Sequence, residues 1–157
     1  MTRNVELDEL YRDIILDHYR KPRNRGRIDD SNATAEGLNP VCGDQVRLQM
    51  HIEPEGRIDA IGFQGSGCSI SQAAASIMTV SVKGKSVREA SGMVRGVRSM
   101  LTEGARPPEE AGDDIEALQG VAQFPARVKC AMLPWTVLEQ ALQEGPGQDD
   151  PAKEVST

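Results

Sequence analysis

Three cysteines that are far apart in the chain, together with one aspartate, are the strongest constraint on the fold. Cys42 precedes Gly43 and Asp44, Cys68 follows Gly-Ser-Gly, and Cys130 follows Arg-Val-Lys. Each cysteine lies where a loop is predicted to meet a strand or a helix, and at such junctions short side chains can turn toward a common point. Three thiolates and one carboxylate are four ligands, the number that tetrahedral Zn²⁺ takes. No C-x-x-C pair is present, so the metal prediction depends on the fold bringing these residues together.

Composition limits the remaining possibilities. A chain of 157 residues suggests one domain, expected at 1–144, followed by a disordered tail at 145–157 that has no apolar pattern. The formal net charge of −6 argues against a nucleic-acid partner. No apolar run is long enough to span a membrane, and the N-terminus is too polar for a signal peptide, so we expect a cytoplasmic protein. Cytoplasmic thiols stay reduced, which favours a metal site or a reactive thiol over disulfides.

Hydrophobic periodicity predicts a mixture of strands and helices. Alternating apolar residues from Val46 to Ile52 indicate a strand, and the turn 53–56 makes it a hairpin with the next strand. Ser86 and Glu89 form a capping box at the start of a helix that Gly104 ends. The predicted strands are 33–38, 46–52 and 57–63, and the predicted helices are 5–19, 69–82, 87–103, 113–120 and 131–143. We therefore predict an α+β fold, a small three-stranded antiparallel sheet covered by helices.

The residues around each cysteine suggest particular roles. Cys68 is predicted to begin a helix, where the partial positive charge favours a thiolate. Cys42 and Asp44 can point to the same side of an extended segment, since side chains two residues apart do so. Cys130 is also predicted to begin a helix. Arg127 and Lys129, which precede it, could hold an anionic sulfur species.

Each of these features also has a purely structural interpretation. Cys68 could be a buried cysteine in a glycine-rich turn, Asp44 an ordinary strand-start aspartate, and Arg127 a solvated surface residue. His18 and His51 are far in sequence from every cysteine. We interpret both histidines as structural or exposed residues.

Several segments resemble the IscU/SufU (NifU N-terminal-like) family. They are LYRDIILDHYRKPRN (10–24), NPVCGD (39–44) and GSGCSIS (65–71). Two further segments, IEALQGV (115–121) and FPARVKCA (124–131), are similar to the SufU branch of that family, as is the long segment between the second and third cysteines. The resemblance covers about residues 7–143.

The resemblance implies a zinc-dependent sulfurtransferase. Proteins of this branch accept persulfide sulfur from SufS, a cysteine desulfurase that uses pyridoxal phosphate, and pass it toward iron–sulfur cluster assembly on downstream SUF scaffold proteins. The zinc ligands implied for this chain are Cys42, Asp44, Cys68 and Cys130. Cys42 is the implied sulfur acceptor, and Arg127 is expected to assist it.

Two other functions remain open at this point. The same ligands could hold iron in a scaffold on which a [2Fe–2S] cluster is assembled, or zinc could be structural in a domain that only recruits partners. IscU proteins carry a histidine just before the third cysteine, where this chain has Lys129. That difference disfavours a scaffold of the IscU kind.

Overall fold

Three strands form an antiparallel sheet, as the hairpin pattern predicts. The computed structural model describes residues 5–40, 43–108 and 112–145, so Cys42 and all of the predicted tail except Gly145 lie outside the described residues. The strands are β1 (Ala33–Asn39), β2 (Asp44–Ile52) and β3 (Ile58–Ser66), with β2 in the centre. Asn39 pairs with Asp44 where β1 meets β2, and Gln45 pairs with Ser66 where β2 meets β3. One end of the sheet therefore gathers the end of β1, the start of β2 and the end of β3.

The two faces of the sheet are covered differently. Val46, Leu48 and Met50 are buried against the helices, which explains the apolar alternation in β2. Gln49 points to the other face and is buried as well. Its side-chain Oε1 accepts a hydrogen bond of 3.2 Å from the N–H of Ile28, so the connection before β1 covers part of that second face.

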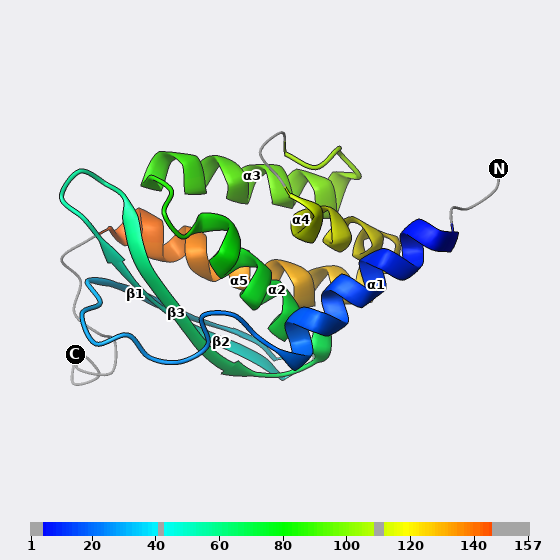
Figure 1. The fold of residues 1–157 in the computed structure, drawn as a ribbon, viewed down its shortest axis with the longest axis horizontal. Coiled ribbons are helices and arrows are strands. Elements are labelled where there is room, and N and C mark those ends of the chain that lie inside the picture. The colour runs from blue at the N-terminus through cyan, green and yellow to red at the C-terminus, as the bar shows by residue number, and fades with distance from the viewer. Residues whose placement is uncertain (1–4, 41–42, 109–111, 146–157) are drawn as a thin grey trace.

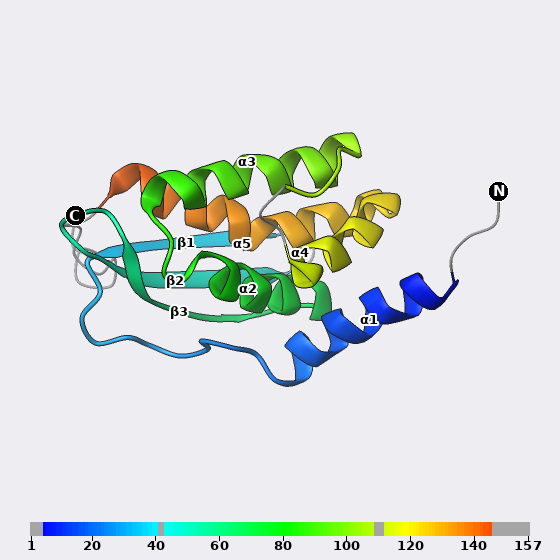
Figure 2. The same ribbon diagram turned by 45° about the horizontal axis from the view of Figure 1, so that its top comes forward.

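Five α-helices and a 3₁₀ helix complete the described chain (Figure 1). They are α1 (Val5–Arg20), α2 (Ser69–Val82), α3 (Val87–Glu103), α4 (Asp113–Ala117), η1 (Leu118–Gln123) and α5 (Pro125–Glu144). α5 lies over β1 and β2, while α2 lies over β3 and beside α5. α3 packs on α5 on the side away from the sheet, and α1 packs against α2 and α4 (Figure 2). The α+β architecture predicted from the sequence is confirmed.

α5 and β1 approach each other closely at a glycine. A Cβ on Gly37 would come within 2.5 Å of Val137 Cγ2 and 3.2 Å of Leu133 Cδ1. Real Cβ atoms essentially never come within 3.0 Å of another atom, so a side chain on residue 37 would push α5 away from β1 at this point. The face of β1 that carries Gly37 is thus the face that meets α5.

Most of the predicted element boundaries are confirmed. α2 has the predicted bounds, and α3 begins at the predicted capping box, in which Glu89 N–H donates to Ser86 Oγ (3.0 Å) and Ser86 N–H donates to Glu89 Oε1 (2.9 Å). Gly104 ends α3 in the left-handed conformation with φ 71°. These signals are local, which explains why the sequence predicts them well.

The predicted start of the last helix is wrong. α5 begins at Pro125 rather than near Ala131, so Cys130 lies in the second turn of the helix and not at its start. Pro125 occupies the first turn, where the missing N–H costs nothing. Pro134, which would fall in the first turn of a helix that began near Ala131, lies inside α5 and is buried. Packing against the core keeps the helix intact around it.

His18 is a structural residue, as expected. It is 2% exposed, and its ring nitrogens lie 2.7 Å from Ser76 Oγ and 2.8 Å from Asp114 Oδ2. These two bonds join α1 to α2 and α4. His51 lies on β2 and pairs with Asp59 at 2.6 Å.

No helix within the described ranges combines the length and apolar character that crossing a bilayer requires.

Candidate metal centre

Three of the four predicted ligands lie together at the end of the sheet where β2 begins. One ligand atom from each of Asp44, Cys68 and Cys130 lies within 4.8 Å of the other two. Asp44 is the first residue of β2, Cys68 is the N-cap of α2, and Cys130 lies in the second turn of α5. Cys42, the fourth predicted ligand, lies outside the described residues. Neither histidine belongs to this group, which is consistent with the structural roles expected for both.

The glycine before Cys68 makes room for the carboxylate of Asp44. Gly67 has φ 143°, and a Cβ there would collide with Asp44 Oδ1. The same turn directs the backbone N–H of Cys68 at that oxygen, to which it donates a hydrogen bond of 2.8 Å. The glycine before Cys68 therefore allows the Asp44 side chain to approach the backbone closely.

The Cys68 sulfur takes the position of a helix-capping acceptor. The N–H of Ser71 points at Cys68 Sγ at 3.4 Å, and the hydroxyl of Ser71 donates to the Cys68 carbonyl at 3.1 Å. Ser71 itself is fully buried. The cysteine motifs do not point to Ser71, although its place three positions after the predicted N-cap Cys68 is the signal that could have identified it.

Asp44 is held as a carboxylate although it is buried. Burial raises the pKa of the Asp44 carboxyl, but the N–H of Cys68 and hydrogen bonds from neighbouring side chains outweigh burial and lower the pKa below its usual 3.8. Those side chains belong to Cys130, Ser71 and Cys68. Asp44 Oδ2, the oxygen that does not accept from the Cys68 N–H, lies 3.9 Å from Cys68 Sγ. One carboxylate oxygen is therefore anchored while the other faces sulfur.

The geometry and chemistry of this group fit a zinc ion. Ligand atoms in a tetrahedral zinc site with bonds of about 2.0–2.3 Å lie about 3.5–3.8 Å apart. The observed separations, 3.9 Å from Asp44 to Cys68 and at most 4.8 Å within the group, need only small side-chain movements to reach those values. Thiolates with one carboxylate are a donor set that suits Zn²⁺, and the described group leaves one tetrahedral position for a further ligand.

An apolar groove lies beside the cluster. It has a volume of about 940 Å³ and lies between α1, the start of α2, η1 and the start of α5. Ser69, the neighbour of Cys68, is part of its wall, as is Arg127. Phe124, which is 55% exposed, also lines the groove. Arg127 and Lys129 are both exposed, so the structure places these cations at the surface near the cluster rather than among its ligands.

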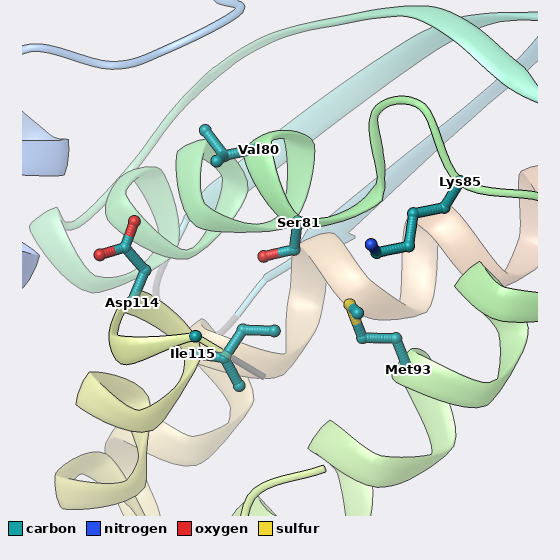
Figure 3. Close-up of a pocket in the computed structure, with 7 residues that line it drawn as sticks. Val80, Ser81, Lys85, Met93, Asp114 and Ile115 are labelled. Atoms are coloured by element: carbon teal, nitrogen blue, oxygen red, sulfur yellow. The ribbon is translucent and has the colours of Figure 1, made fainter. Parts of the chain in front are cut away.

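A second, smaller cavity lies apart from the cysteines. It has a volume of about 350 Å³ and lies between α2, α3 and α4, with Lys85, Met93 and Asp114 among its lining residues (Figure 3). The Asp114 carboxylate already pairs with His18, and the cavity wall contains no cysteine. This cavity therefore offers none of the chemistry of the cluster.

Comparison with known proteins supports the resemblance drawn from the motifs. Residues 10–131 match the family model described as the NifU-like N terminal domain. The chain is 44% identical over 149 residues to the zinc-dependent sulfurtransferase SufU of Bacillus subtilis, a match that covers 94% of this chain and 99% of that protein. It is 36% identical over 138 residues to the iron–sulfur cluster assembly scaffold protein IscU of Streptococcus pyogenes, covering 88% and 86% of the two chains.

A solved structure shares the fold. A crystal structure from Fervidobacterium islandicum, of a protein described as a candidate iron–sulfur cluster assembly scaffold for the SUF system, superimposes with a TM-score of 0.76. The two chains are 35% identical, and the match covers 82% of this chain and 93% of the other. The family match, the extent of these likenesses and the grouped Asp44, Cys68 and Cys130 agree, and the chain belongs to the NifU-like N-terminal domain family.

Proposed function

We propose that this protein is a zinc-dependent sulfurtransferase of the SUF system. It would accept persulfide sulfur from the cysteine desulfurase SufS and pass it to downstream SUF scaffold proteins for iron–sulfur cluster assembly. The observation that carries the proposal is the approach of Asp44, Cys68 and Cys130 within 4.8 Å of one another, in a chain 44% identical to a zinc-dependent sulfurtransferase. Because the chemistry needs reduced thiols, the cytoplasm is the compartment in which we expect it to occur.

The ligands we propose for zinc are Cys42, Asp44, Cys68 and Cys130. When bound, Zn²⁺ would stabilise the cysteines as thiolates at neutral pH. The hydrogen bond from the Cys68 N–H holds Asp44 in place, while Cys68 and Cys130 belong to helices packed on the core. Cys42 is the ligand that we assign to the transfer of sulfur, since its place in the sequence falls between the end of β1 at Asn39 and the start of β2 at Asp44.

The proposed transfer is a thiolate–persulfide exchange. The thiolate of Cys42 attacks the outer sulfur of the SufS persulfide and forms a new S–S bond. The S–S bond of the donor breaks, and the donor cysteine leaves as a thiolate. The proton on the outer sulfur moves with that sulfur. One thiolate is consumed and one is released, so the step involves no net oxidation.

We assign Arg127 a supporting role in this step. Its side chain is exposed and lines the groove whose wall also includes Ser69, next to Cys68. A guanidinium at that place would attract an anionic sulfur species as it enters and would offset part of the negative charge of the thiolates and the carboxylate.

A scaffold function is the second candidate. The observation that favours it is the 36% identity over 88% of the chain to a protein named as an IscU scaffold. In that case, Cys42, Cys68 and Cys130 with Asp44 would hold a [2Fe–2S] cluster. Protein purified without oxygen would then show the visible absorption of a cluster, whereas the zinc-dependent function predicts colourless protein.

Replacement of the proposed acceptor tests the function directly. We expect Cys42→Ser to keep the fold but abolish the stimulation of SufS turnover by this protein, since serine cannot accept the persulfide sulfur. After wild-type protein is incubated with SufS and cysteine, mass spectrometry should detect one added sulfur, about 32 Da, on the peptide that contains Cys42. Val41→Ala, which alters the neighbouring side chain but keeps the thiol, is the matched control and should retain the stimulation.

Other outcomes have clear meanings. Sulfur on the peptide that contains Cys130 would reassign the acceptor. Assembly of an iron cluster with no sulfur on any cysteine would favour the scaffold function instead.

A further inference from the structure

Asn39 carries a buried hydrogen-bond donor that nothing in the described chain satisfies. The side chain is only 8% exposed, and its Nδ2 has no partner among the described residues. An unsatisfied buried donor has a cost comparable to that of a lost hydrogen bond, and native proteins retain few of them. Gln72 Oε1 and Trp135 Nε1 also lack partners among the described residues, but Asn39 is the one that pairs with Asp44. A donor left over at the edge of a candidate site is available to a ligand that binds there.

The sheet register places Asn39 beside the cluster. Asn39 is the last residue of β1 and pairs with Asp44, the first residue of β2. Side chains of directly paired residues project from the same face of a sheet, with Cβ atoms about 4.5–5.5 Å apart. The Asn39 side chain is therefore a direct neighbour of Asp44, on the face of the sheet where the cysteines are gathered.

The packing of α5 on β1 also places the Asn39 side chain beside the cluster. Gly37, two residues before Asn39 on β1, lies against Leu133 and Val137 of α5, so Asn39 projects toward the same helix. Asp44 lies within 4.8 Å of the Cys130 ligand atom, one turn before Leu133 on α5. Register and packing together place the Asn39 side chain beside Asp44 and on the side of β1 that faces α5, the helix that carries Cys130.

We propose that the Asn39 carboxamide N–H binds the anionic sulfur that this centre holds. The inference rests on the proposed sulfur-transfer function and adds a sulfur-binding residue to it. The Asp44 carboxylate already accepts from the Cys68 N–H and from the side chains of Cys130, Ser71 and Cys68, so the acceptor that remains for Asn39 is sulfur. A hydrogen bond to the ionised form of a thiol or persulfide favours that form. A carboxamide does not titrate, so it donates at every physiological pH.

The backbone of Asn39 also bounds the segment that carries the proposed acceptor. Its carbonyl accepts a hydrogen bond of 2.8 Å from the N–H of Gly43. Gly43 directly follows Cys42 in the sequence, so this hydrogen bond joins Asn39 to the residue next to the proposed acceptor.

The test compares Asn39→Leu, which is similar in volume but has no donor, with the wild type and with Gln49→Leu. Gln49 is a buried amide on the opposite face of β2, so its replacement controls for the general loss of a buried amide. Zinc content and melting temperature are measured first. The rate at which SufS loads sulfur onto the protein in a single turnover is then followed by mass spectrometry. We expect Asn39→Leu to load about tenfold more slowly, with Gln49→Leu within twofold of the wild type.

A second measurement separates sulfur binding from a structural role. With Co²⁺ in place of zinc, the sulfur-to-metal charge-transfer band should move to longer wavelength in Asn39→Leu, because the sulfur lone pairs lose a stabilising N–H. Asn39→Asp, which keeps the shape but replaces the donor by a negative charge, should show the same shift and slower loading. If Asn39→Leu does not fold, Asn39→Asp alone decides the question.

Loading within twofold of wild type together with an unmoved cobalt band would overturn the role of Asn39. A wild type that accepts no sulfur at all would overturn the proposed function instead, so the two failures are distinguishable.

Discussion

Gly67 shows how a residue without a side chain can shape a candidate metal centre. Its φ of 143° lies in a region that residues with a Cβ rarely adopt, and the space where a Cβ would lie is filled by the Asp44 carboxylate. The same turn presents the Cys68 N–H to that carboxylate at 2.8 Å. Backbone conformation, carboxylate position and the direction of the Cys68 sulfur thus depend on one glycine.

Replacement of this glycine should disturb both stability and metal binding. We expect Gly67→Ala to lower the free energy of unfolding by about 2–4 kcal/mol, because strain at positive φ adds to a collision with Asp44. We also expect the variant to retain less zinc. The matched control is Gly26→Ala, which also has a positive φ, 126°, but open space where the Cβ would lie. Urea unfolding and metal analysis provide the two measurements. If both variants lose the same amount of stability and both keep their full zinc content, a collision between the new Cβ and Asp44 does not explain the effect of Gly67→Ala.

An ion pair links helix α3 to helix α5. The guanidinium of Arg98 donates to both carboxylate oxygens of Glu139, at 3.0 and 2.6 Å. The two side chains are 38% and 32% exposed, so solvent screens the pair. We therefore expect the pair to add only modestly to the free energy of unfolding. Because α5 also carries Cys130, this pair helps to hold the helix in the position from which the cysteine reaches the cluster.

The contribution of this pair should depend on pH. The hydrogen bond from Arg98 lowers the pKa of Glu139 below its usual 4.5. The carboxyl group of Glu139 is therefore protonated at a higher pH in the unfolded chain than in the folded chain. The stabilisation by the ion pair is complete above about pH 4.5 and is lost as the pH falls through the pKa of Glu139 in the folded protein. At pH 7, we expect Glu139→Gln to lower the free energy of unfolding by about 0.5–1 kcal/mol.

The measurement is a urea titration at a series of pH values in metal-free protein, since metal affinity itself changes with pH. Glu103→Gln, at the exposed end of α3, is the control and should leave stability nearly unchanged. A destabilisation by Glu139→Gln that stays the same from pH 7 down to pH 3 would show that the loss comes from packing and not from charge.

Across the molecule, the candidate centre brings together three elements that lie far apart in the sequence. Asp44, Cys68 and Cys130 come from β2, the start of α2 and α5, and the chain between the last two runs through α3, α4 and η1. An ion bound by all three would connect the sheet to both helices that cover it. Metal binding should therefore stabilise the whole fold rather than one loop.

Metal removal tests this coupling. We expect the purified protein to contain about one zinc per chain, and removal of the metal by a chelator to lower the melting temperature by about 5–10 °C, the effect of a ligand at about 100 times its Kd. Zinc should restore the original value, whereas Mg²⁺, which prefers oxygen ligands, should not. Asp44→Asn should show a smaller shift. Protein that lacks zinc and melts at the same temperature with and without a chelator would argue against a metal centre.

The sequence predicts the features of this protein that depend on neighbouring residues. The alternation in β2, the capping box at Ser86 and the glycine that ends α3 each act within a few residues, because hydrogen bonds and side-chain periodicity of that kind are local. The cysteine motifs also predict that Asp44, Cys68 and Cys130 approach one another, because few other arrangements make use of such a ligand set.

Features that depend on residues far apart in the sequence could be identified only from the tertiary structure. Both Pro125 and Pro134 are compatible with the first turn of a helix, and only the packing of α5 on the sheet shows that the helix begins at the first of them. The buried bonds of His18 to Ser76 and Asp114 join residues 58 and 96 positions away. The place of Asn39 beside Asp44 follows from the pairing of β1 with β2 and from the helix above them. Such contacts depend on how whole elements pack, which a local pattern of residues does not contain.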